Sequence, residues 1–370
     1  MTFLKSNVTL NGRAFLIAWS ILLILFFVII GTFSLTKIDN LKKTSAARHA
    51  DRMSASRIEA GRTAPELTLP AGSNPEKVQV GVYLDHLASI SVADNTWSPE
   101  FYLWFKWSND AINPGDTFDI IEGEIVSKQK QSEFHRHGEH YEKYLIKAQI
   151  TKYFDSLRFP LDDHVLTISI EDGKFPWKDL EYVSDIGHSN ISSRVKIPGY
   201  IVTKHSLIMK PHTYKSNFGD PRLEKNNHAT FSQHLYGVSI ARDGLGIYFK
   251  VFIGLFAAVA ISLLAFFIKP TDVDPRFGLG VGGFFGAVAN SLLSVSFVAD
   301  NGSLSLLDMV NMIGLISIFL TLVESTISLY LFDIRGEVAL SRLFDRVSFT
   351  IIFIGFTLIN IFIPIIGSAN

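Results

Sequence analysis

Five long apolar runs mark the chain, one near its beginning and four in its last third. The first covers residues 14–36, has the core LIAWSILLILFFVIIG and contains no charged residue. About 20 apolar residues in a helix, rising roughly 1.5 Å each, cross the hydrocarbon core of a bilayer. A cleavable signal peptide has an apolar stretch of only about 7–15 residues with a small-residue exit. This run is longer and ends in SLTKIDN, so we expect an uncleaved transmembrane anchor.

Four further apolar runs follow residue 240 and are separated by short connections. They cover Ile247 to Ile268, Phe277 to Ala299, Met309 to Phe332 and Val347 to Ile366. A helix of a soluble protein is rarely apolar on all its faces over such a length. We therefore predict a four-helix transmembrane domain over residues 244–370, in addition to the N-terminal anchor.

The charges of the connections predict the orientation of these spans. Basic residues concentrate in the first and third connections, whereas the second connection and the tail GSAN have none. Basic loops stay in the cytoplasm, so we expect a cytoplasmic N-terminus over residues 1–13 and an outer segment over residues ~37–240. Four basic residues just after the first span oppose this orientation, but the four later spans agree with it. The basic residues of the two connections are Lys269, Arg276, Arg335, Arg342 and Arg346.

The outer segment begins with a polar stretch and continues as short alternating segments. Residues 37–76 are polar, which predicts a linker. From residue 77, segments such as VQVGVYL and EFYLWFKW alternate apolar and polar positions and are rich in β-branched and aromatic residues. This pattern indicates strands. Many strands without intervening helices predict an antiparallel β-sandwich over residues 77–243.

Composition narrows the function. Hydrophobic residues make up 48% of the chain and its formal net charge is −1, which gives no electrostatic argument for nucleic acid as a partner. Cysteine is absent, so disulfides and thiolate metal sites are excluded. No nucleophile-elbow, metalloprotease, phosphate-loop or dinucleotide motif occurs. We expect neither an enzyme nor a bound cofactor.

The segment KYFDSLRFPLDDHVL, residues 152–166, resembles the signature loop of the pentameric ligand-gated ion channels, the Cys-loop receptor superfamily. That loop has an Asp four residues before a Phe-Pro pair, a second Asp two residues after the Pro and a polar residue two further on. The flanking cysteines of animal receptors are absent here, as they are in bacterial relatives. The matching residues are Asp155, Phe159, Pro160, Asp162 and His164.

The resemblance, with the order of sandwich and four spans, implies a bacterial-type channel with an added anchor. It implies a multi-pass homopentamer in the cell (inner) membrane, with the sandwich on the periplasmic or extracellular side. A small-molecule or proton ligand would bind the sandwich and gate ion flow. The signature loop would touch the connection DNGSLSL and transmit the state of the sandwich. A family proline early in the first channel span is missing, with Gly254 roughly at its place.

Residues 276–300 correspond to the pore-lining span of the family. The resemblance implies that Arg276, at the start of this span, lies at the cytoplasmic mouth of the pore. Helical spacing then assigns one face without charge and with few hydroxyls. Phe285 and Leu292 on that face predict a hydrophobic gate. The small-residue pattern of Gly278, Gly282 and Gly286 also fits a packed bundle, so a non-conducting membrane receptor, sensor or scaffold on the same fold stays open. The mouth and face residues are Asp274, Arg276, Gly278, Gly282, Phe285, Ala289, Leu292 and Ser296.

Aromatic side chains are candidates for ligand binding, since aromatic boxes bind ligands in this family through cation–π contacts. Simple packing in the sandwich is the alternative for each of them. The candidates by position are Trp104, Phe175, Trp177, Tyr182, Tyr214 and Phe218.

Two groups of ionisable residues remain. The run FHRHGEHYEKY holds His135, His137 and His140, whose spacing suits zinc or copper; a solvated hairpin tip or a proton sensor are the alternatives. Glu324 lies inside the third C-terminal run, where an ionisable group normally faces the protein interior and has a partner.

Overall fold

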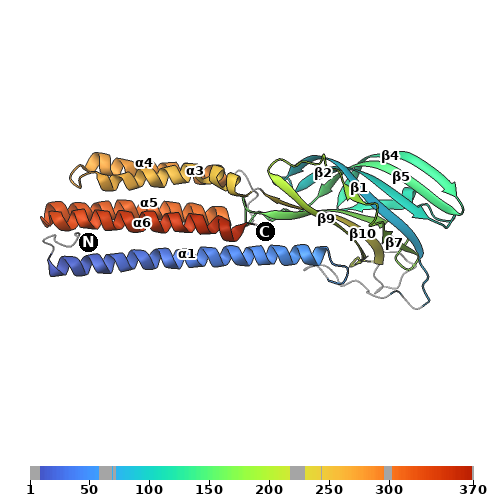
Figure 1. The fold of residues 1–370 in the computed structure, drawn as a ribbon, viewed down its shortest axis with the longest axis horizontal. Helices are drawn as coiled ribbons and strands as arrows, with labels where there is room; N and C mark the ends of the chain where they lie inside the picture. The colour runs from blue at the N-terminus through green and yellow to red at the C-terminus, as the bar shows by residue number, and fades with distance from the viewer. Residues whose placement is uncertain are drawn as a thin grey trace. The chain divides into compact units, whose positions relative to one another are not determined.

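The computed structural model describes residues 9–57, 69, 72–216, 230–242, 244–295 and 302–368. These residues form two compact units. The helical unit contains residues 1–42, 156–162 and 243–370, and the β-domain contains residues 43–155 and 163–242. Figure 1 shows the elements of each unit.

The β-domain has two sheets. In the larger one the order is β4 (Gly123–Arg136), β5 (Glu139–Thr151), β2 (Thr96–Trp107), β1 (Glu76–Ser91) and β7 (Leu180–Ser184), with β8 (Asn190–Ile191) also pairing with β1. In the smaller one the order is β3 (Phe118–Ile121), β6 (Asp163–Asp172), β10 (Thr230–Arg242) and β9 (Tyr200–Thr213). A short helix, α2 (Pro114–Thr117), precedes β3. Most ladders are antiparallel, but β7 and β8 pair with β1 in parallel.

Both sheets contribute side chains to one hydrophobic core, as expected for a sandwich-like domain. Alternate residues of β1, from Val78 to Leu84, are fully buried. Phe101, Leu103 and Phe105 of β2 join them, and β6 contributes Leu166 and Ile168 from the other sheet. The alternation seen in the sequence is confirmed in β1 and β2, because successive side chains of a strand point to opposite faces.

The helical unit contains the first part of α1 (Leu10–Arg52) together with α3 (Gly244–Leu263), α4 (Val273–Val295), α5 (Leu306–Leu329) and α6 (Val338–Gly367). A 3₁₀ turn, η1 (Leu264–Phe267), extends α3, and a π turn, η2 (Tyr330–Ile334), extends α5. Among the described residues, four helices are long and apolar enough to cross a membrane, namely α1, α3 with η1, α5 with η2, and α6. The apolar run of α4 continues in the sequence to Ala299, past the described residues.

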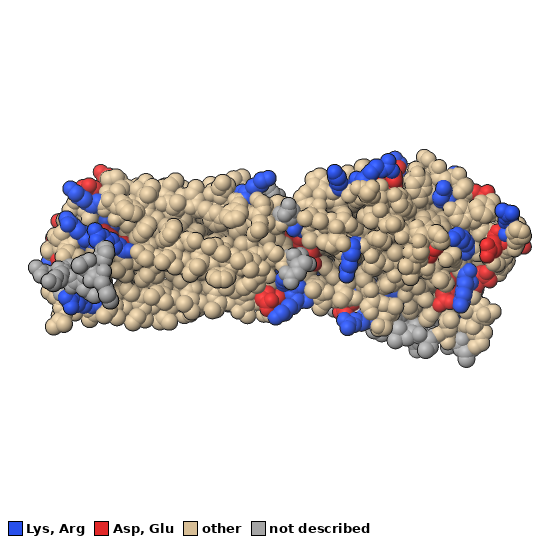
Figure 2. Space-filling model, in the orientation of Figure 1, with Lys and Arg blue, Asp and Glu red and all other residues tan. Residues whose placement is uncertain are grey.

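The ends of these helices follow from local chemistry. Ser305 caps α5 by accepting a hydrogen bond from the Asp308 N–H, while the Asp308 carboxylate accepts one from the Ser305 N–H. Gly336, between η2 and α6, has a φ of 66°, which suits glycine because it lacks a Cβ. Figure 2 shows a band without charged side chains along the face of the helical unit in view, and basic side chains at the end where α1 begins.

The helix of the N-terminal region is longer than the predicted anchor of residues 14–36. α1 continues to Arg52 and so includes the first part of the predicted linker. No glycine or proline interrupts residues 32–52, so nothing in the local sequence stops the helix. Ile38 is fully buried in the core of the helical unit, and Ser45 is buried further along.

Candidate functional site

The segment of residues 156–162 belongs to the helical unit, although the strands on either side of it belong to the β-domain. Phe159 and Leu161 are 5% and 1% exposed and belong to the hydrophobic core of the helical unit, to which α1, α3, α4, α5 and α6 all contribute. The peptide bond between Phe159 and Pro160 is cis. The predicted signature loop is therefore a part of the helical core and not only a surface turn.

One backbone hydrogen bond and one side-chain hydrogen bond fix this loop to two helix ends. The Leu306 N–H, at the start of α5, donates to the Leu157 carbonyl at 2.8 Å. The Arg158 guanidinium donates to the carbonyl of Gly367, the last residue of α6, at 3.2 Å. A Cβ added to Gly367 would lie 2.7 Å from the Leu161 side chain, so the absence of a side chain at residue 367 allows the close approach. Leu306 is the last residue of DNGSLSL, the connection that the resemblance implied as the partner of the loop.

The remaining signature residues lie at the two ends of this loop. Asp162 is 1% exposed and is the last loop residue of the helical unit. Asp155 and His164 belong to the β-domain. The His164 ring is buried and meets the Phe154 ring edge-on at a centroid distance of 5.0 Å.

The last turns of α1, residues 43–52, belong to the β-domain and contact the flanks of the signature loop. The Arg48 guanidinium hydrogen bonds to the Asp155 carboxylate. His49 Nδ1 lies 3.2 Å from an oxygen of Asp163. Sequence reasoning missed these partners, because it assigned residues 43–52 to a linker.

One face of α4 is unpartnered within the described chain. The predicted pore-lining residues of this face are exposed, with Phe285 at 68% and Leu292 at 71%, and a Cβ added to Gly278 or Gly282 would meet no atom within 4 Å. Ser296 lies outside the described residues. The exposed residues among those predicted to line the pore are Asp274, Gly278, Gly282, Phe285, Ala289 and Leu292.

Arg276 does not share this face, which corrects the sequence prediction. Its side chain is fully buried and pairs with Asp345 of α6 at 2.7 Å. A further hydrogen bond runs from the guanidinium to the Ile268 carbonyl at 3.0 Å. Residue 276 lies nearly opposite residue 278 around a helix of 3.6 residues per turn, and a buried cation requires a partner.

Within the described chain, Gly280 and Gly283 allow close packing of helices. A Cβ on Gly280 would lie 2.4 Å from Leu322 of α5, and one on Gly283 would lie 2.1 Å from Ser262 of α3. The predicted stripe of Gly278, Gly282 and Gly286 instead lies on the exposed side.

An aromatic cavity of about 480 Å³ opens on the β-domain. Its aromatic rings come from β1, β2 and β5, its lysines from β2 and β5, and its histidine from the segment before β8. Trp104 is the predicted ligand-binding candidate that belongs to this cavity. The lining residues are Tyr83, Tyr102, Trp104, Lys106, Gln131, Tyr141, Lys143 and His188.

Asp185 organises the floor of this aromatic cavity. It is 2% exposed and accepts hydrogen bonds from Trp104 Nε1 at 3.0 Å, Lys106 Nζ at 3.1 Å and His188 Nδ1 at 2.7 Å. Burial acts to raise the pKa of Asp185, but these hydrogen bonds outweigh burial and lower it. The carboxylate is thus ionised and neutralises the charge of Lys106. The ammonium group of Lys143, a second lysine of the cavity, lies 5.7 Å from the centre of the Tyr102 ring.

The other aromatic candidates do not gather at this cavity. Tyr182 is fully buried in the β-domain core, and burial raises the pKa of its hydroxyl. Trp177 is 7% exposed, and Phe175 packs against the same core. The Tyr214 hydroxyl donates to Glu171 at 2.9 Å. Phe218 lies outside the described residues.

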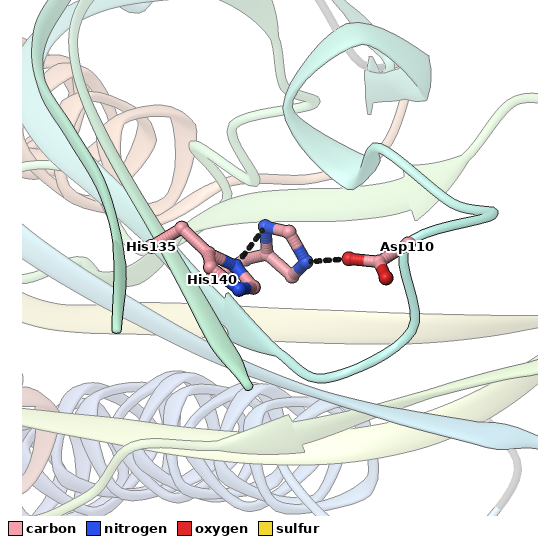
Figure 3. A group of neighbouring side chains, drawn as sticks. All are labelled: Asp110, His135 and His140. Atoms are coloured by element: carbon pink, nitrogen blue, oxygen red, sulfur yellow. Dashed lines mark hydrogen bonds and ion pairs between the residues drawn. The ribbon is translucent and has the colours of Figure 1, made fainter. Parts of the chain in front are cut away.

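The histidine run forms a smaller cluster than predicted. His135 Nδ1 and His140 Nδ1 are 3.1 Å apart, and His140 Nε2 lies 2.6 Å from Asp110 Oδ1 (Figure 3). His137 is not a member, because it occupies the hairpin turn with a φ of 53°. Asp110 was not predicted, since it lies 25 residues before His135 on another loop.

Glu324 lies on α5 with its side chain fully buried. Ser348 of α6 and Trp19 of α1 are its polar neighbours, and the Trp19 indole N–H donates to Ser348 at 3.2 Å. An acidic residue inside a candidate span thus faces the protein interior, as the sequence predicted.

No protein-family model and no curated protein matches the chain. The class of protein therefore rests on fold and site. The chain is a membrane protein that combines apolar helices able to cross a bilayer with a two-sheet β-domain. A loop between two strands of that β-domain packs into the helical unit.

Proposed function

We propose that this protein is a ligand-gated ion channel of the pentameric type, in which a ligand bound to the β-domain changes the state of the helical unit. The observation that carries the proposal is the segment of residues 156–162, which joins strands β5 and β6 and packs among α3, α5 and α6. Because protein interiors are close-packed, a displacement of β5 or β6 would shift Phe159 and Leu161 and so change the packing of the helices around them.

A conducting pathway requires several copies of α4 around an axis. Its exposed face between Gly278 and Leu292 is apolar and has no partner in the described part of one chain. Rings of Phe285 and Leu292 in a symmetric assembly would make a hydrophobic constriction, which can stay dry and block ions. The pentameric number of subunits comes from the resemblance of the signature loop.

The aromatic cavity is the ligand site of this proposal, and its charges favour an anion. Asp185 compensates Lys106, whereas Lys143 keeps an uncompensated charge in the lining. The Lys143 ammonium already lies near the face of Tyr102, where a cationic ligand of the family type would bind. A small aromatic carboxylate fits both the aromatic rings and this charge.

The proposed location is the cell (inner) membrane. Residues 1–13 lie in the cytoplasm and the β-domain in the periplasm or outside the cell, because the connections 269–276 and 333–346 are basic. Fusions of a compartment-specific reporter to each end test this orientation; a cytoplasmic signal from the C-terminus would contradict it.

Ion flux through reconstituted protein tests the function. Phe285→Ser and Leu292→Ser each put a hydroxyl in the constriction, which hydrogen bonds to water and lowers the barrier to wetting. We expect either variant to leak ions in liposome flux assays or planar-bilayer recordings, and electron microscopy to show one axial symmetry in all variants.

Leu358→Ser is the matched control. Leu358 is an exposed leucine of α6, at 46%. Because it lies on another helix than the proposed pore-lining helix α4, the same substitution there should not change the current. Leu293, the neighbour of Leu292 on α4, is not a suitable control, because its side chain is also exposed, at 66%. If neither α4 variant conducts in correctly assembled protein, the non-conducting receptor on the same fold replaces the channel.

A further inference from the structure

Two histidines face each other across the hairpin of β4 and β5. His135 is the Cα partner of His140 in the antiparallel ladder, and side chains of directly opposed residues lie on the same face of a sheet. Their Nδ1 atoms are 3.1 Å apart and their ring centroids 4.1 Å apart. Figure 3 shows the two rings with these nitrogens turned toward each other.

This separation suits two ligands of one metal ion. With metal–nitrogen bonds of about 2.0–2.1 Å, two imidazole nitrogens lie roughly 2.9 Å apart at a square-planar angle and roughly 3.3 Å apart at a tetrahedral angle. The observed 3.1 Å lies between these values. Neutral imidazole is a preferred ligand of zinc, copper and nickel.

Asp110 and Trp107 hold the ring of His140. The Asp110 carboxylate accepts a hydrogen bond from His140 Nε2 at 2.6 Å, so the proton is on Nε2 and the lone pair of Nδ1 points to His135. Carboxylates that bind the distal nitrogen of a histidine in this way orient metal ligands in many proteins. The Trp107 ring stacks on His140 at 5.0 Å with an interplanar angle of 14°.

We propose that His135 and His140 bind one divalent transition-metal ion through their Nδ1 atoms, with Asp110 as a positioning residue and water completing the coordination. The ion replaces the proton that the two facing nitrogens otherwise share. The two imidazole ligands distinguish this site from a magnesium or calcium site, which requires mostly oxygen ligands. The proposal is independent of channel activity.

Copper binding by full-length, tag-free protein in detergent tests this site. We expect one saturable Cu²⁺ site whose electron paramagnetic resonance spectrum shows coupling to two nitrogens, and displacement of Cu²⁺ by excess Zn²⁺. Binding should weaken in acid, because protons compete with the metal ion for the imidazole nitrogens. These measurements on the unaltered protein do not depend on the folding of any variant.

His135→Asn and His140→Asn should each lower Cu²⁺ affinity about 100-fold and remove the two-nitrogen spectrum, whereas the matched His137→Asn leaves both unchanged. Asp110→Asn should lower the affinity on the order of 10-fold but keep the coupling to two nitrogens, because both imidazole ligands remain. A wild-type protein without saturable binding overturns the proposal. So does an unchanged affinity in His135→Asn or His140→Asn, or a loss of binding in His137→Asn.

Discussion

Arg276 on α4 and Asp345 on α6 form a buried bidentate ion pair, with the guanidinium nitrogens 2.7 and 3.1 Å from the carboxylate oxygens. Two parallel hydrogen bonds fix the relative position of the two side chains as well as their charge. The Arg276 guanidinium also holds the Ile268 carbonyl at the end of the preceding 3₁₀ turn. This pair therefore joins the start of α4 to α6 and to the end of η1.

Asp345→Asn leaves the Arg276 charge buried without its partner. Removal of one member of a buried pair costs about 3–5 kcal/mol, so we expect the free energy of unfolding in detergent to fall by about that amount. Titration with a denaturing detergent, followed by circular dichroism, measures the change.

Glu337→Gln is the control for a more exposed ion pair. Arg335 and Glu337 are 3.1 Å apart, with side chains 53% and 24% exposed, and exposed pairs contribute only about 0–1 kcal/mol. A loss in Glu337→Gln as large as that in Asp345→Asn would contradict the special role of the buried pair.

His234 makes the β-domain sensitive to acid. Its side chain is fully buried on β10 with Nδ1 3.0 Å from the Ser184 hydroxyl, and burial lowers its pKa from 6.5 to about 4. The unfolded chain therefore binds a proton below about pH 6.5 that the folded protein accepts only below about pH 4. The contribution of neutral His234 to the free energy of unfolding is therefore fully present above pH 6.5. It is lost as the pH drops to 4, which lowers the free energy of unfolding by on the order of 3 kcal/mol.

His234→Gln removes this titration and should flatten the dependence of unfolding on pH between 6.5 and 4. Tryptophan fluorescence during urea unfolding at several pH values measures it. His86 is exposed, so His86→Gln should keep the slope of the unaltered protein. Equal slopes in all three proteins would show that other groups cause the acid sensitivity.

Leu161 should stabilise the helical unit more than the β-domain, although it lies between two strands in the sequence. Leu161→Ala leaves a cavity among the helices, which costs about 2–5 kcal/mol. Hydrogen exchange should increase in the first turns of α3 and the last turns of α6, where Gly244 and Gly367 approach this side chain.

Leu166→Ala is the complementary variant, because Leu166 is fully buried in the β-domain core. Its effect on hydrogen exchange should appear in β6 and β10. The same pattern of exchange in both variants would show that the loop does not belong to the helical core.

Lys143 should determine the charge preference of the aromatic cavity. Lys143→Met removes the uncompensated cation and should weaken the binding of benzoate, used as a probe, on the order of 10-fold, because a charge-assisted hydrogen bond is lost. Lys147→Met is the control, since Lys147 pairs with Glu100 at 3.1 Å and does not line the cavity. Quenching of tryptophan fluorescence measures binding; stronger binding of a quaternary ammonium probe than of benzoate would contradict the proposed ligand class.

The amino-acid sequence by itself determined the elements of this protein. In a bilayer, an apolar run of 20 or more residues can pair its own backbone N–H and C=O groups by forming a helix. The alternating apolar positions in VQVGVYL and EFYLWFKW predict strands with one buried face. The face of α4 from Gly278 to Leu292 was predicted from helical spacing together with the family resemblance, and its described residues are exposed. These properties depend on residues close together in the chain.

The tertiary structure decided which distant residues complete each site. The sequence pattern predicts Arg276 among the pore-lining residues. In the structure it is buried, because Asp345, 69 residues later in the chain, neutralises its charge in the interior. Asp110 joins His135 and His140 from a separate loop, and Phe159 finds its core among helices more than 80 residues away. A buried charge or an apolar side chain requires a partner, but no local pattern specifies which part of the chain supplies it.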